Sequence, residues 1–182
     1  ALNFLQFPYL VPLQGKGNVD EAKRHFQSLR LAKPEIKGLC ILDRDASDGA
    51  SIRGMPEGMS TRTWNRYEIE NYLLIPDLLK RFVRHDQPPL LSQPDERRIE
   101  DEFAANFPAR VDYFGDLAAL RDLKASDFIV GLLSQTSHPL AKRDLYMLGA
   151  LSRPEEIHPD VVAMLDAVAE ILPPAKPAET AR

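Results

Sequence analysis

The chain of 182 residues contains a single cysteine, Cys40, which excludes a disulfide framework within the chain. Such low cysteine use is typical of a reducing compartment, so we expect a cytoplasmic location. Cys40 lies in an apolar run and is interpreted as a small buried side chain. The four histidines are far apart and have no cysteine partners, which argues against a structural zinc site.

Long apolar runs are also missing. No segment approaches the about 20 apolar residues needed to cross a bilayer, so no membrane partner is expected. The first ten residues lack the basic segment and apolar core of a secretory signal. They also lack an initial Met, and we expect either a fragment of a longer protein or a chain without its first residues.

An excess of positive charge is absent as well, because the net charge is -4. This argues against a domain that binds nucleic acid by bulk electrostatics alone. It does not exclude a nuclease, since carboxylates that hold metal ions make a sequence acidic while the bound cations reverse the local sign. Hydrophobic residues at 44% and charged residues at 27% are typical of a globular domain.

The first quarter of the chain predicts a βαβ unit. A short apolar run over 9–11 ends in a glycine-containing turn over 14–18, and apolar residues then recur at helical spacing over 19–31. The continuous apolar run over 38–42 is typical of a strand buried on both faces of a parallel sheet. The expected fold class is therefore α/β, with a parallel sheet flanked by helices.

The rest of the chain is predicted to be mainly helical. We expect a loop over 46–60, a strand over 60–64, and helices over 76–85, 95–107, 142–151 and 159–171, with a proline-rich break over 86–94. Residues 127–133 are ambiguous between strand and helix. The predicted organisation is one domain over 1–172, with a helical insertion or cover at about 76–125 and a disordered tail over 173–182.

Two acidic pairs carry the candidate chemistry. Asp43 and Asp45 directly follow the predicted strand 38–42, at the strand end where open α/β sheets place their sites. Glu68 and Glu70 lie at a predicted strand-to-helix boundary. Close carboxylates repel one another unless a cation neutralises them, and Mg²⁺ prefers oxygen ligands. Either pair alone also fits a solvated turn or a helix start.

Taken together, Ile-Leu-Asp-Arg-Asp, a loop, a Thr-x-Trp strand and Glu-Ile-Glu-Asn-Tyr-Leu resemble the Toprim domains of the overcoming-lysogenization-defect (OLD) family of nucleases. The resemblance covers about residues 9–75. It implies that Asp43, Asp45, Glu70 and, less directly, Glu68 are ligands of two Mg²⁺ or Mn²⁺ ions, with Ca²⁺ as a non-productive substitute. It also implies DNA as the substrate, an ATP-binding-cassette-type ATPase domain N-terminal in the same polypeptide, and a homodimer as a further partner.

The same family uses a lysine late in the domain. Lys142 is the candidate, with Arg143 as the alternate and His138 as a possible helper. Family domains also begin with a strand that ends in glutamate, but no glutamate precedes Glu21, which lies in a predicted helix. Either that strand lies upstream of the first residue, or the site is incomplete.

Two other functions fit parts of the pattern. A phosphatase of the haloacid dehalogenase type would use Asp43 as nucleophile and Asp45 as acid, but Ala46 and the pair Gly115-Asp116 match that family poorly. A non-catalytic interaction domain would keep the fold without cutting. Trp64 and Tyr67, which flank Arg66, suit base stacking or an ordinary core equally well.

Overall fold

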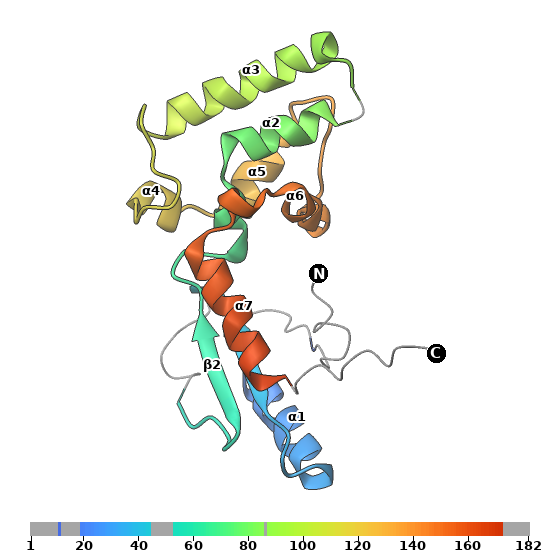
Figure 1. Cartoon of the computed structure of the whole chain (residues 1–182), viewed down its shortest axis with the longest axis vertical. Coiled ribbons are helices and arrows are strands. Elements are labelled where there is room, and N and C mark those ends of the chain that lie inside the picture. Colours follow the sequence, from blue (N-terminus) through green and yellow to red (C-terminus); the bar gives the residue numbers. More distant parts are fainter. Residues whose placement is uncertain (1–10, 12–18, 45–52, 86, 173–182) are drawn as a thin grey trace, which may run out of the picture. The chain divides into compact units, whose positions relative to one another are not determined.

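The computed structural model describes residue 11 and residues 19–44, 53–85 and 87–172, and it shows a mixed α/β chain. Its contacts divide the chain into two compact units. We call residues 1–42, 46–63 and 162–182 the sheet unit, and residues 43–45 and 64–161 the helical unit. Figure 1 shows the elements of both units along the chain.

The sheet unit contains helix α1 (Val19–Ala32) and the strands β1 (Gly38–Leu42) and β2 (Met59–Thr63). The strands pair in parallel, from Gly38 opposite Met59 to Leu42 opposite Thr63. The predicted helix 19–31 and strand 38–42 are thus confirmed, and the second strand begins one residue earlier than predicted. The predicted strand 9–11 and glycine turn 14–18 lie almost entirely outside the described residues.

Two glycines shape the sheet unit. A Cβ at Gly38 would lie 2.7 Å from the Phe26 ring, so the missing side chain lets α1 pack closely on the start of β1. Gly58, just before β2, has a φ of +84°, a conformation that residues with a Cβ rarely adopt. The buried core beside them is small and consists of Val19, Cys40 and Leu42, with Met55 and Met59 packed against it.

The helical unit carries the larger core. Its elements are η3 (Ile69–Leu73), α2 (Pro76–Arg84), α3 (Pro89–Asn106), α4 (Ala118–Arg121), α5 (Ala125–Leu133), η4 (Lys142–Asp144), α6 (Tyr146–Leu151), η5 (Pro154–Glu156) and the first turn of α7 (Pro159–Ile171). Sixteen buried hydrophobic residues form one continuous cluster here. Helix α2 packs against both α3 and α6.

Predicted and observed helices agree closely except at the prolines. Helices α2 and α7 match 76–85 and 159–171, and residues 142–151 form η4 and α6. Helix α3 begins at Pro89 rather than 95, because proline suits the first helical turn. Pro94 sits inside α3 at an exposed position, where one lost backbone hydrogen bond can be met by water. The ambiguous segment 127–133 is helical, within α5.

The remaining organisational predictions are not decided. That residues 76–125 are an insertion into a single domain stays a prediction, and the tail 173–182 lies outside the described residues. In the part of the chain that the structure describes, no helix is both long enough and apolar enough to cross a membrane.

Candidate active site

The segment after β1 is held by backbone and side-chain contacts within the helical unit. The Arg44 N–H donates to the Tyr67 carbonyl at 3.0 Å, which lays this segment beside the start of Glu68–Glu70. The Arg44 guanidinium also donates to Asp122 at 2.8 Å. Asp43, directly before it, is exposed, and Asp45 lies outside the described residues.

Asn71 fixes the second acidic segment. Its side chain is fully buried, and its amide donates to the carbonyls of Leu120 and Leu123, both at 2.7 Å. Its Oδ1 accepts the Glu68 N–H at 3.0 Å. Because a buried amide with all these partners tolerates few other positions, Asn71 sets where the two glutamates lie. Asn71 lies within the motif Glu-Ile-Glu-Asn-Tyr-Leu, but no role was predicted for it from the sequence.

Glu68 is only 5% exposed, and both its oxygens face positive charge. One oxygen accepts the Ser126 N–H in the first turn of α5, where the helix dipole favours a carboxylate. The other lies 3.9 Å from the Lys142 Nζ. Glu68 therefore anchors α5 through one oxygen, and its other oxygen faces the Lys142 cation.

Glu70 is half-buried and sits among other charges. Burial is the largest influence and raises the pKa of its carboxyl, and the carboxylates of Glu68 and Asp43 raise it further. A hydrogen bond to its own backbone and the cation of Lys142 act in the opposite direction. The structure thus brings Asp43, Glu68, Glu70 and Lys142 into one electrostatic neighbourhood, which we call the acidic cluster.

The basic candidates behave differently. Lys142 is the first residue of η4, and its side chain is 54% exposed beside Glu68. The Arg143 side chain is 87% exposed and lies 3.6 Å from Asp144. His138 contacts Gln87 and Ser137 and packs edge-on against Phe82 of α2. Of the three candidates, Lys142 is the one whose ion pair reaches the acidic cluster.

The described residues include no group of three or more His, Cys, Asp or Glu side chains placed to hold a metal ion. Asp45 falls outside that set. The donor chemistry of the acidic cluster still suits a hard cation, since its acceptors are carboxylate oxygens. Burial, and after it the repulsion from Glu68 and Asp43, raises the pKa of Glu70. The metal-ligand roles of Asp43, Asp45, Glu68 and Glu70 therefore stay predictions.

Trp64 and Arg66 belong to the core, whereas Tyr67 is only half-buried. Trp64 is 7% exposed, and its ring lies 5.3 Å from that of Tyr72. The buried Arg66 guanidinium sits 5.0 Å from the Tyr72 ring and donates to the Asn71 carbonyl at 3.0 Å. Burial on this scale leaves no face on which a base could stack, so the core interpretation holds for Trp64 and Arg66.

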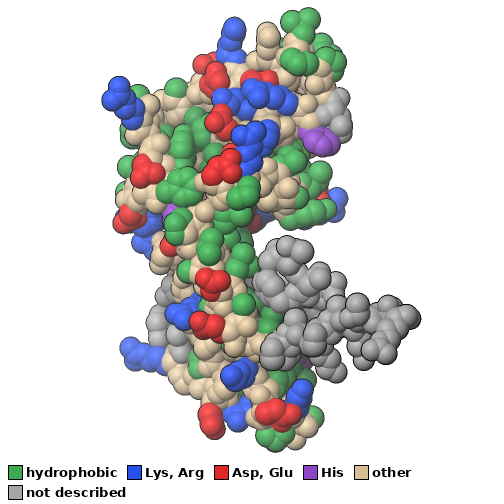
Figure 2. All heavy atoms as spheres, in the orientation of Figure 1, with side chains coloured by type: hydrophobic (Ala, Val, Ile, Leu, Met, Phe, Trp, Pro, Cys, Tyr) green, Lys and Arg blue, Asp and Glu red, His purple; other side chains and the backbone are tan. Residues whose placement is uncertain are grey.

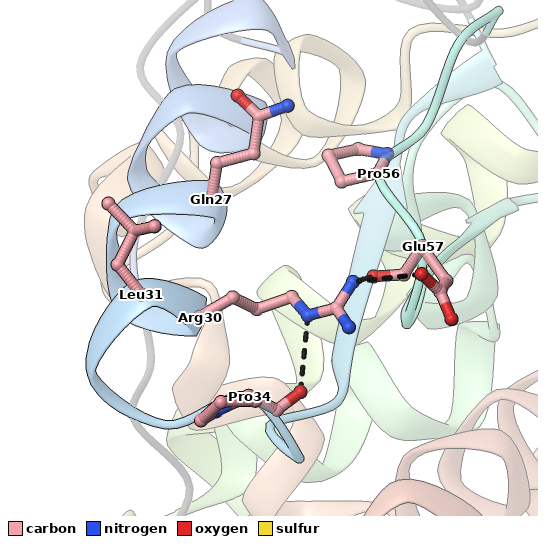
Figure 3. Close-up of a pocket in the computed structure, with 6 residues that line it drawn as sticks. All are labelled: Gln27, Arg30, Leu31, Pro34, Pro56 and Glu57. Atoms are coloured by element: carbon pink, nitrogen blue, oxygen red, sulfur yellow. Dashed lines mark hydrogen bonds and ion pairs between the residues drawn. The ribbon is translucent and has the colours of Figure 1, made fainter.

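The sheet unit has a separate shallow hollow of about 380 Å³, which Figure 3 shows between α1 and the turn before β2. Arg30 crosses it, donating to the Pro34 carbonyl at 3.2 Å and to the Glu57 carbonyl. These bonds tie the end of α1 to the turn. The described residues that line the hollow include no cluster of catalytic side chains, and Arg30 has a structural role there.

Comparisons with protein families, with characterised proteins and with solved structures find no match to this chain.

Proposed function

We propose that this chain is a metal-dependent nuclease domain of Toprim type that hydrolyses phosphodiester bonds in nucleic acid. One observation carries the proposal: the Arg44 N–H donates to the Tyr67 carbonyl at 3.0 Å, which lays Asp43 beside Glu68 and Glu70, and the Lys142 Nζ lies 3.9 Å from Glu68. The resemblance to OLD-family nucleases named these residues independently of their arrangement.

The chemistry of the acidic cluster supports the choice. Burial, and after it the carboxylates of Glu68 and Asp43, raises the pKa of Glu70, which means that its anion is destabilised. A bound divalent cation would relieve the repulsion among these carboxylates. Asp43 and Glu70, with Asp45 and the second oxygen of Glu68, would hold Mg²⁺ or Mn²⁺. When bound, two such ions supply an activated water and neutralise charge at the leaving oxygen.

The protein's own residues would take three further roles. Lys142 would stabilise the negative charge that develops on the phosphate in the transition state. Asn71 and the Arg44–Asp122 pair would position the two acidic segments without touching the substrate. The Glu68 oxygen that accepts the Ser126 N–H would keep the first turn of α5 in place. An N-terminal ATPase domain and a dimer belong to the same proposal.

The decisive experiment is plasmid nicking with a series of Mg²⁺, Mn²⁺ and Ca²⁺ concentrations. Wild-type protein should cut with Mg²⁺ or Mn²⁺ and not with Ca²⁺. Asp43→Asn should abolish cutting because it removes a charged ligand without changing shape, while Asp101→Asn, an exposed carboxylate on α3, should cut normally. Cutting by Asp43→Asn in chelator at the wild-type rate would refute the proposal.

Lys142→Ala tests the catalytic cation. We expect a single-turnover rate lowered about 100-fold with nearly unchanged affinity, because the lysine acts on charge that appears only in the transition state. An unchanged rate at saturating protein would remove Lys142 from the mechanism. Hydrolysis of a phosphate monoester, with DNA left intact, would instead favour the phosphatase alternative.

A further inference from the structure

The segment from Lys142 to Leu151 presents one exposed face whose composition is unusual for this chain. Leu145 and Leu148 are buried, at 2% and 0% exposure, and fix the inner side of the segment. The opposite side carries Lys142, Arg143 and Tyr146, which lie three and four positions apart and are therefore neighbours on a helical surface. We call these three residues the η4–α6 face.

Tyr146 is the most exposed aromatic side chain in the part of the chain that the structure describes, at 73%. An aromatic ring left in water loses the burial that normally stabilises it, so its exposure calls for a partner with an apolar or π surface. Helix α6 packs through its other side against α2, which leaves the ring directed away from the core.

The cations of this face differ from those on α2. Lys80, Arg81 and Arg84 on α2 each make close ion pairs with carboxylates. Figure 2 shows basic and acidic side chains interleaved there. On the η4–α6 face, by contrast, Lys142 and Arg143 lie 3.9 and 3.6 Å from their carboxylate partners, beyond hydrogen-bond distance. Of the two, Arg143 is 87% exposed and stands outside the acidic cluster, so its charge is the one available to attract an anion.

We propose that the η4–α6 face binds a single strand of nucleic acid, with Tyr146 stacking on an unpaired base and Arg143 contacting a backbone phosphate. A cation beside an exposed aromatic ring matches the two repeating features of such a strand, its phosphate and its base. The face begins at Lys142, whose Nζ lies 3.9 Å from Glu68 of the acidic cluster, so a strand held here would present a phosphate to that cluster. The inference rests on the proposed function and names its substrate as unpaired rather than duplex nucleic acid.

Fluorescence anisotropy on the full chain tests the inference. The probes are a labelled single strand of about 16 nucleotides and the matching duplex, both in chelator so that no cleavage occurs. An RNA strand of the same sequence, as competitor, distinguishes the two sources of an unpaired strand. We expect tighter binding of the single strand, and about tenfold weaker single-strand binding in Tyr146→Ala with duplex binding unchanged.

Two further variants separate stacking from charge. Tyr146→Phe keeps the ring and should bind as wild type. Arg143→Ala should reduce the slope of log affinity against log salt by roughly 0.7, the value of one single-strand phosphate contact. Leu90→Ala and Arg97→Ala, an exposed apolar and an exposed basic side chain on α3, are the matched controls and should change nothing. Trp64 fluorescence reports whether each variant is folded.

Wild-type affinity of Tyr146→Ala for the single strand would overturn the inference. A change of oligomeric state in Tyr146→Ala without loss of affinity would also overturn it, because the face would then be a protein contact. Binding in chelator does not depend on cleavage. Tyr146-dependent binding without metal-dependent cutting would therefore refute only the nuclease proposal, and cutting with Tyr146-independent binding would refute only this inference.

Discussion

The two units of the chain differ in how completely each buries its own apolar surface. The helical unit has sixteen buried hydrophobic residues in one cluster, whereas the described core of the sheet unit has three. Parallel strands are normally covered on both faces, and a two-stranded sheet is marginal by itself. The exposed fraction of Ile41 on β1, 37%, fits a sheet whose described surroundings cover it incompletely.

The candidate site takes its rigidity from the larger core of the helical unit. Every described member of the acidic cluster belongs to the helical unit, including Asp43, although Asp43 directly follows a strand of the sheet unit. Asn71 and Glu68 link the acidic segments to α4 and α5, which pack on the large core. A site that must hold carboxylates together against repulsion benefits from such a support.

Core truncation should separate the units most strongly. Ile129→Ala removes a fully buried side chain of α5 and should cost about 2–5 kcal/mol of unfolding free energy. Leu42→Ala in the sheet unit should cost about 2 kcal/mol, since its small core can collapse around the cavity. Trp64, the single tryptophan, reports on the helical unit in denaturant, and hydrogen exchange reports on β1 and β2.

If both variants lower the denaturant midpoint of Trp64 fluorescence equally, the two units unfold as one, and the difference in their stability does not exist. If only Ile129→Ala lowers that midpoint, and Leu42→Ala lowers the hydrogen-exchange protection of β1 and β2, the two units unfold separately.

Glycine substitutions should act in opposite directions in the two units. Gly58→Ala should destabilise the sheet unit by about 1–2 kcal/mol, because its φ of +84° strains a residue with a Cβ and the added atom would meet the Ile36 carbonyl at 3.3 Å. Gly131→Ala in α5 has open space around its Cβ and should stabilise the helical unit by about 0.5–1 kcal/mol. Hydrogen exchange of β2 measures the effect of Gly58→Ala, and thermal unfolding followed by Trp64 fluorescence measures the effect of Gly131→Ala. Destabilisation by both substitutions would contradict the expected opposite signs.

The smallest expected effect is a pH dependence confined to the helical unit. The His158 Nδ1 accepts the Asp160 N–H at 3.0 Å and so caps the start of α7. Burial lowers the pKa of His158, and the charge of Arg66 lowers it further, so the folded protein favours the neutral ring. The resulting stability is fully present above the ordinary value of 6.5 and is lost as pH falls below it.

We therefore expect the thermal unfolding midpoint, followed by Trp64 fluorescence, to be lower at pH 5 than at pH 7.5. The corresponding loss of unfolding free energy should not exceed about 1 kcal/mol, the contribution of a helix cap. His158→Asn keeps a cap that cannot be protonated and should reduce this dependence. His85→Asn, an exposed histidine at the end of α2, is the control and should keep it. A dependence that survives in His158→Asn would assign it to another group.

Elements with a strong local signal could be predicted from the amino-acid sequence. The apolar run 38–42 and the helical spacing over 19–31 and 159–171 specified β1, α1 and α7, because burial on one or both faces imposes that periodicity. The acidic pairs and Lys142 were also selected from sequence, although through a family resemblance and not through their spacing. Residues 127–133 stayed ambiguous, since a short apolar run suits a buried strand as well as a buried helix.

The partners of these side chains, in contrast, come from segments far away in the sequence. The first turn of α5 meets a carboxylate from Glu68, 58 positions earlier, and Lys142 reaches the same side chain from the other direction. Trp64 and Arg66 turned inward, where Arg66 is held by backbone carbonyls and the Tyr72 ring. Burial, desolvation and long-range charge pairing depend on which distant segments share a core, and no local pattern in the chain encodes that choice.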